Sequence, residues 1–173
     1  MRDAAFDNIR PGLARRCGEV LAQIHAAPRS ALPDLPTSDA AGELARYEEI
    51  YRTLGAERPV FEAAFRWLEA RAPALDSPVL VHGDFRNGNL MIHPDQGLVG
   101  VLDWELAHLG DPAEDLGWLC VNSWRFGQWR KPVGGFGQID DLLAGYAAGG
   151  SPATTQDEYA SGVPRALKFA VLL

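Results

Sequence analysis

The sequence has few cysteines and no long apolar run. Its 173 residues include two cysteines, Cys17 and Cys120, which lie far apart among apolar or helix-forming neighbours. Two isolated thiols provide neither a disulfide framework nor a zinc cluster, so we expect both to be reduced and buried. No segment is apolar for long enough to span a bilayer, and the first residues lack the apolar stretch of a secretion signal. We therefore expect a soluble, cytoplasmic protein.

Positive charge is also scarce. The chain has 16 Lys and Arg residues against 23 Asp and Glu residues, which gives a formal net charge of -7. Nucleic-acid backbones and anionic membranes carry charge of the same sign, so neither is expected as the main partner. The hydrophobic fraction of 47% is that of an ordinary globular protein and is enough for one sizeable core. Residues 1–173 are therefore expected to form a single unit.

Most of the chain has the apolar spacing of amphipathic helices, in which apolar residues recur every three or four positions. Ser38 or Asp39 is placed to cap the second of these helices, and Gly55 follows its end. The expected helices cover residues 11–26, 39–54, 59–71, a segment from 112 onward, 139–148 and a stretch from about 164.

Three short runs have a different pattern. Residues 79–81, 90–92 and 98–102 are rich in β-branched and other apolar residues and are separated by Gly, Asn, Asp and Pro. They predict short strands around a loop, with a hairpin turn over residues 93–97. The expected fold class is α+β and mainly helical, with a short β-hairpin segment.

The loop between the first two of these strands carries a chemically informative pattern. His82, Asp84 and Asn89 are spaced as H-x-D-x-x-x-x-N, and Asp103 ends the third strand. Phosphoryl transfer from ATP to a hydroxyl depends mainly on positioning and charge neutralisation. Asp84 is the candidate to accept the hydroxyl proton, and Asn89 and Asp103 are candidate oxygen ligands of Mg²⁺. The hairpin should bring these two ligands together.

Neighbouring residues add to this pattern. Arg86 lies two positions after Asp84 and is expected to contact a transferring phosphate, where a cation stabilises the developing charge. Gly83 lets the loop turn. Simpler readings remain open at this stage, since Asp84 and Asn89 are also common turn residues and Asp111 before Pro112 is a common helix cap.

Other residue types receive simpler assignments. Trp118 is expected to pack in the core. His25, His93 and His108 show no ligand spacing and are given no role.

The segments 82–90, 101–105 and 110–117 resemble the aminoglycoside phosphotransferase and choline kinase family, which has a protein-kinase-like fold. The resemblance extends from about Leu13 to about Tyr146 and implies the large, C-terminal lobe of that fold. It implies that Asp84 is the catalytic base, that Asn89 and Asp103 bind magnesium, and that His82 and Asp115 brace the loop. The form of the motif is most similar to the branch found beside acyl-CoA metabolism.

The family's N-terminal lobe has no visible counterpart. That lobe carries a five-stranded sheet, a phosphate-covering loop and a lysine, whereas the lysines here, Lys131 and Lys168, both follow the catalytic loop. We therefore expect residues 1–173 to be one partial domain without the nucleotide-binding lobe, clipped at both ends. Association with that missing lobe is the protein partnership that the pattern leaves open.

Three functions follow from these observations. The first is an ATP-dependent phosphotransferase that moves the γ-phosphate to a hydroxyl of a small molecule, as a fragment of a longer enzyme with Mg²⁺ as cofactor. The second is a non-catalytic truncated remnant that acts as a binding or interaction module. The third is a metal-dependent hydrolase that uses Asp84, Asn89 and Asp103. The sequence does not identify the acceptor.

Overall fold

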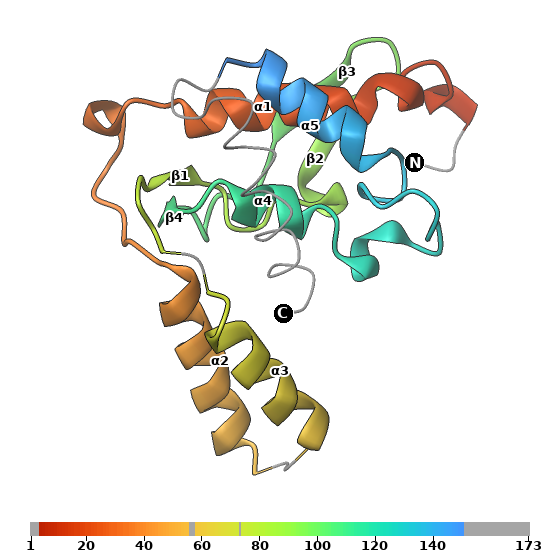
Figure 1. The fold of residues 1–173 in the computed structure, drawn as a ribbon. Coiled ribbons are helices and arrows are strands. Elements are labelled where there is room, and N and C mark those ends of the chain that lie inside the picture. The colour runs from red at the N-terminus through yellow and green to blue at the C-terminus, as the bar shows by residue number, and fades with distance from the viewer. Residues whose placement is uncertain (1–3, 56–57, 73, 151–173) are drawn as a thin grey trace.

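The structure, a computed structural model, describes residues 4–55, 58–72 and 74–150 (Figure 1). Its helices are α1 (Leu13–His25), α2 (Ala40–Thr53), α3 (Pro59–Glu69), α4 (Ala113–Trp118) and α5 (Ile139–Ala148). Its strands are β1 (Val79–Val81), β2 (Leu90–His93), β3 (Gly97–Val101) and β4 (His108–Gly110). The mainly helical α+β class is confirmed, and the helix expected near residue 164 lies outside the described residues.

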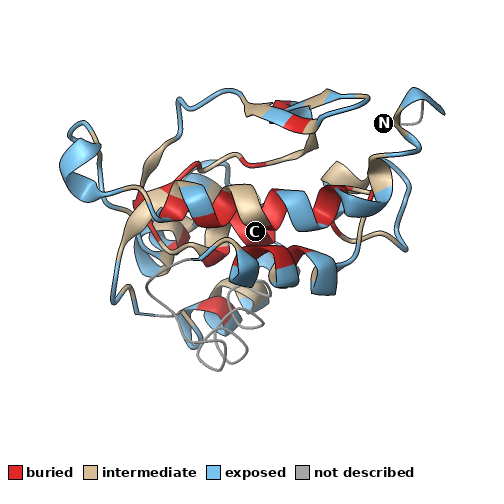
Figure 2. Cartoon of the chain, turned by 90° about the horizontal axis from the view of Figure 1, so that it is seen from above, coloured by how far each residue is buried: buried red, intermediate tan, exposed pale blue. Residues whose placement is uncertain are grey.

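Helices α1 and α5 lie side by side in the main body, with buried residues where they face each other (Figure 2). Two glycines bring their backbones together. A Cβ atom on Gly18 would lie 2.0 Å from the carbonyl oxygen of Leu142, and one on Gly145 would lie 1.9 Å from that of Arg15. No side chain fits at either position, so the contact depends on glycine.

The main core extends from this helix pair to the loop and the short helix α4. Cys17 and Cys120 belong to it and are free and buried, as expected. Burial raises the pKa of the Cys17 thiol above its usual range and that of Cys120 to about 12. Both thiols are therefore neutral and have the character of small apolar side chains.

Helices α2 and α3 form a separate hairpin that projects from the main body (Figure 1). Its own small core contains Leu44 and Leu68. Asp39 is the residue that caps α2, because its carboxylate accepts a hydrogen bond of 2.7 Å from the Gly42 N–H. None of the helices in the described part of the chain is both long and apolar enough to cross a bilayer.

The helix limits differ slightly from those expected. Helix α1 begins at Leu13 instead of Pro11, because residues 10–12 form a 3-10 turn. Helix α3 ends at Glu69 instead of Arg71. Helix α4 is a short helix that ends at Trp118.

The strands form two separate antiparallel pairs, β1 with β4 and β2 with β3. The expected hairpin is present, with Leu90 opposite Val101 and a register shift after Met91. Strand β4 was not expected, because its three residues, His-Leu-Gly, show no alternation. It is held by pairing with β1, in which Val81 lies opposite His108.

The glycine contact between α1 and α5 can be tested by stability. Gly18→Ala should lower the free energy of unfolding by about 3 kcal/mol, because the helices must separate to admit the methyl group. Gly12 is the matched control, since a Cβ atom there meets nothing within 4 Å. Gly12→Ala should leave stability equal or raise it by about 0.5 kcal/mol. Urea unfolding measures both, and equal values for the two variants would contradict the packing described.

A second stability test concerns His108. Its Nδ1 lies 2.9 Å from the Leu106 carbonyl oxygen and its Nε2 lies 3.2 Å from a Glu114 carboxylate oxygen. Both partners accept hydrogen bonds, which favours the imidazolium. The hydrogen bond to Glu114 raises the pKa of His108 to about 9.

Because the folded pKa exceeds the unfolded value of about 6.5, this contribution is fully present below pH 6.5 and is lost as the pH rises through 9. His108→Gln should therefore cost on the order of 1–2 kcal/mol at pH 6, an amount reduced by the exposure of Glu114. The measurement is urea unfolding of both proteins between pH 6 and 10. Curves that stay parallel, instead of converging near pH 9, would show that the pair is not responsible.

Candidate active site

The carboxylate of Asp115, on α4, holds the loop that carries the sequence motif. Asp115 is fully buried. Its Oδ2 accepts a hydrogen bond of 2.8 Å from the His82 backbone N–H, and its Oδ1 accepts one of 3.0 Å from the Gly83 N–H. His25 Nε2 lies 3.2 Å from the same Oδ2, and His25 Nδ1 lies 2.8 Å from the Tyr146 hydroxyl. One carboxylate thus connects the loop to α1 and α5.

Gly83 turns the chain between His82 and Asp84. Its φ is +80°, and a Cβ atom there would lie 2.5 Å from the Leu106 carbonyl oxygen. Two residues later, the fully buried Phe85 anchors the loop in the main core. Phe85 leaves no signal in the sequence, because one aromatic residue within a polar loop has no periodic partner.

His82 connects the start of the loop to the end of β3. Its Nδ1 accepts a hydrogen bond of 3.1 Å from the Asp84 N–H, and its Nε2 lies 3.0 Å from the Leu102 carbonyl oxygen. The first partner can only donate and the second can only accept, so these contacts assign the neutral tautomer with hydrogen on Nε2. Both ring nitrogens are used within the protein, which supports a bracing role.

The Asp84 carboxylate faces three donors, and 16% of its side chain is exposed. Its Oδ1 accepts from Trp118 Nε1 at 2.6 Å, and its Oδ2 accepts from Asn89 Nδ2 at 2.8 Å. Arg86 Nε lies 3.0 Å from Oδ1 and 2.9 Å from Oδ2. Since these partners all donate, the carboxylate is the ionised form that a general base requires.

Arg86 is held at this carboxylate by a second contact. Its guanidinium carbon lies 4.6 Å from the centre of the Trp124 ring. The Arg86 nitrogen that pairs with Asp84 is Nε. Arg86 was expected to contact a phosphate, and its pairing with Asp84 was not expected.

The segments that carry Asn89 and Asp103 meet at the end of the β2–β3 hairpin. Asn89 is buried, and its Nδ2 donates to the Asp84 carbonyl and side-chain oxygens at 3.0 and 2.8 Å. These acceptors assign the amide orientation, which leaves the side-chain oxygen for another partner. The backbone carbonyl of Asn89 accepts a hydrogen bond of 2.8 Å from the Leu102 N–H, so the two segments meet just before Asp103.

Asp103 is exposed and has a left-handed backbone, with φ of 68°. Such a conformation costs on the order of 1–3 kcal/mol in a residue other than glycine and often occurs at functional sites. Among the residues that the structure describes, no group of three His, Cys, Asp or Glu side chains could hold a metal ion. An amide oxygen and a carboxylate nevertheless fit Mg²⁺, which takes one or two protein oxygens and completes its shell with water and phosphates.

Two site residues differ from their sequence assignments. Trp118 was expected to pack in the core, but it is only partly buried and its indole N–H contacts Asp84. His25 was given no role, but it is buried against Asp115, 90 residues away in the chain. The Asp111 carboxylate accepts a hydrogen bond of 2.8 Å from the Ala113 N–H, as expected of a capping residue, but the residue at the N-cap of α4 is Pro112.

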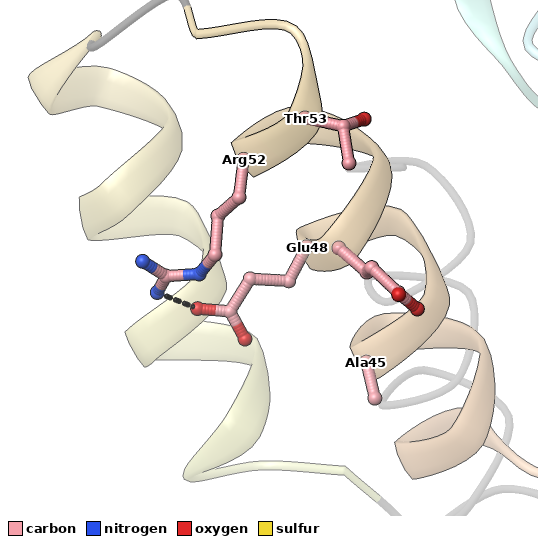
Figure 3. Close-up of a pocket in the computed structure, with 5 residues that line it drawn as sticks. Ala45, Glu48, Arg52 and Thr53 are labelled. Atoms are coloured by element: carbon pink, nitrogen blue, oxygen red, sulfur yellow. Dashed lines mark hydrogen bonds and ion pairs between the residues drawn. The ribbon is translucent and has the colours of Figure 1, made fainter.

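A surface hollow elsewhere shares none of these residues (Figure 3). It is lined by Ala45, Glu48, Glu49, Arg52 and Thr53, all from α2. Glu48 and Arg52 form an ion pair of 2.5 Å across its surface. Because a single exposed helix forms it, the hollow does not enclose a ligand as a functional pocket does.

The role of Asp115 in holding the loop can be tested by a near-isosteric change. Asp115→Asn should lower the free energy of unfolding by about 3 kcal/mol. The donors now bond to two carboxylate oxygens, whereas an amide offers them only one oxygen. Asp95→Asn, in the exposed turn between β2 and β3, is the matched control and should change stability by less than about 0.5 kcal/mol. Thermal and urea unfolding would compare the two, and equal stability would refute the role of this carboxylate.

Comparison with known proteins identifies the family. Residues 2–151 match the model of the phosphotransferase enzyme family. The mouse (Mus musculus) protein named acyl-CoA dehydrogenase family member 10 is 44% identical over 64 residues, which are 36% of this chain and 6% of that protein.

Solved structures have the same fold. Macrolide 2'-phosphotransferase type I matches with 25% identity and a TM-score of 0.65, over 92% of this chain and 51% of its own. The GDP and kanamycin complex of APH(2")-IIia matches with 16% identity and a TM-score of 0.64, over 95% and 53%. The chain thus spans about half the length of these structures. Its match over most of its length, together with the His82–Asp84–Asn89 loop, shows that the chain belongs to the phosphotransferase enzyme family.

Proposed function

We propose that this chain forms the catalytic and metal-binding part of an ATP-dependent kinase that phosphorylates a hydroxyl of a small molecule. The observation that carries the proposal is the direct contact between Asn89 and Asp84, 2.8 Å between Nδ2 and Oδ2. It joins the candidate base to a candidate metal ligand, so that the acceptor hydroxyl and the phosphate can meet in one place.

Each residue of the loop then has a part in the transfer. Asp84 accepts the proton of the acceptor hydroxyl as that oxygen bonds to the γ-phosphorus. The terminal nitrogens of Arg86 stabilise negative charge on the moving phosphoryl group. His82 and Asp115 keep the backbone of the loop in position.

Asn89 and Asp103 would hold Mg²⁺ through their side-chain oxygens. The ion supplies neutralisation of the charge on the ATP phosphates when it is bound. The left-handed backbone of Asp103 supports this assignment, because it turns the chain sharply just where the hairpin meets Asn89.

The relatives support a small-molecule acceptor. One solved relative is named as a macrolide phosphotransferase, and another was solved with GDP and kanamycin. The mouse relative, which is more similar over its shorter match, is named as an acyl-CoA dehydrogenase family member. This identity favours a hydroxyl compound of acyl-CoA metabolism over a drug as the acceptor. Fold alone does not determine the acceptor.

Magnesium-dependent binding of ATP to this chain is the deciding measurement. We expect calorimetry to detect binding of ATP with Mg²⁺ and much weaker binding with EDTA. Asp103→Ala should weaken it about tenfold or more, through the loss of a metal ligand. Asp95→Ala, an exposed carboxylate in the same hairpin, should leave the affinity unchanged.

Equal affinity of the Asp103→Ala variant and the wild-type protein would refute the assignment of Asp103. No binding of ATP by the wild-type chain would refute nucleotide binding by these residues alone and favour the alternative of a non-catalytic binding module.

A further inference from the structure

We propose that Trp118 is a positioning residue for Asp84. Its indole N–H fixes the carboxylate so that the Asp84 lone pairs that now accept from Arg86 Nε–H face the acceptor hydroxyl. The inference rests on the proposed function, in which Asp84 is the base. It starts from the bond of 2.6 Å between Trp118 Nε1 and Asp84 Oδ1.

The contacts of Asp84 use its whole capacity as an acceptor. An ionised carboxylate offers about four lone-pair sites. Trp118 takes one on Oδ1, Asn89 takes one on Oδ2, and Arg86 Nε is shared between the two oxygens. A hydroxyl that gives its proton to Asp84 must therefore replace one of these donors.

Arg86 is the donor that can be replaced. Its one N–H is divided between two acceptors at 3.0 and 2.9 Å, and 26% of its side chain is exposed. Asn89, by contrast, is buried and makes a second hydrogen bond, to the Asp84 carbonyl. An incoming phosphate offers the Arg86 guanidinium a bidentate partner of higher charge. When the guanidinium moves to the phosphate, it opens the face of Asp84 between the two fixed donors.

Trp118 is fixed by the element that also holds the loop. It lies three residues after Asp115 on α4, so both side chains project from one side of that helix. Its ring meets Trp124 edge to face, with centroids 5.7 Å apart and an interplanar angle of 64°. Helix α4 thus sets the backbone of the loop through Asp115 and the carboxylate of Asp84 through Trp118.

The fixed orientation of the Asp84 carboxylate matters during phosphoryl transfer. The acceptor oxygen bonds to the γ-phosphorus, the bond from that phosphorus to the bridging oxygen breaks, and its electron pair leaves with ADP. The hydroxyl proton passes to the Asp84 oxygen that Arg86 has vacated. A carboxylate turned away by even one rotamer cannot receive this proton in line.

The test is Trp118→Phe, which retains a ring against Trp124 and removes the N–H. Trp67→Phe, on the exposed hairpin helix α3, is the matched control. In ¹H–¹⁵N spectra of the full chain, the Arg86 Nε–H resonance should move in Trp118→Phe and stay in Trp67→Phe, because Asp84 turns when one of its fixed donors is lost. If the Trp118 ring only fills space, the Arg86 Nε–H resonance stays in place in Trp118→Phe. An unmoved resonance therefore overturns the proposal.

A kinetic measurement separates this proposal from the proposed function. With MgATP and water as acceptor, Trp118→Phe should lower the kcat for ADP release about tenfold to a hundredfold, as the loss of a hydrogen bond to a charged group does, and leave the KM for ATP unchanged. An unchanged kcat, or a raised KM alone, overturns the positioning role. If the wild-type chain releases no ADP, the proposed function fails for this chain, and the resonance decides whether Trp118 orients Asp84.

Discussion

The hydrogen bonds to the buried carboxylate of Asp115 are the interaction on which the loop over residues 82–89 depends. A charge without solvent contact is costly unless donors surround it, and Asp115 meets two backbone N–H groups of the loop and His25 of α1. His25 in turn contacts Tyr146 of α5. The arrangement requires α1 and α5 to approach closely, which the glycine at position 18 allows.

The loop in turn positions the Asp84 carboxylate. Phe85 fixes it in the core, and His82 connects it to the end of β3 in a defined tautomer. Asp84 is consequently held as an anion among N–H donors, while Asp103 remains exposed in a strained backbone. A partly buried, hydrogen-bonded carboxylate beside an exposed one is an electrostatic division that would suit a base and a metal ligand respectively.

The family of the chain is established, whereas its acceptor is a matter of the site. The match over residues 2–151 establishes the family, whereas the solved structures extend over about twice the length of this chain. A shared fold does not fix the acceptor, which has to be argued from the side chains of the site. The mouse relative, named as an acyl-CoA dehydrogenase family member, matches over 36% of this chain and 6% of its own length.

The sequence by itself determined what is local. Apolar spacing predicted the described helices to within a few residues, turn residues predicted the β2–β3 hairpin, and the spacing of His82, Asp84 and Asn89 identified the family. These features depend on residues close together in the chain, where periodicity and spacing are visible.

Tertiary structure decided the rest. Strand β4 forms because β1 pairs with it, His25 reaches Asp115 across 90 residues, and Trp118 reaches Asp84 across 34. None of these contacts leaves a local pattern, because each depends on where the packing of α1, α4 and α5 returns the chain.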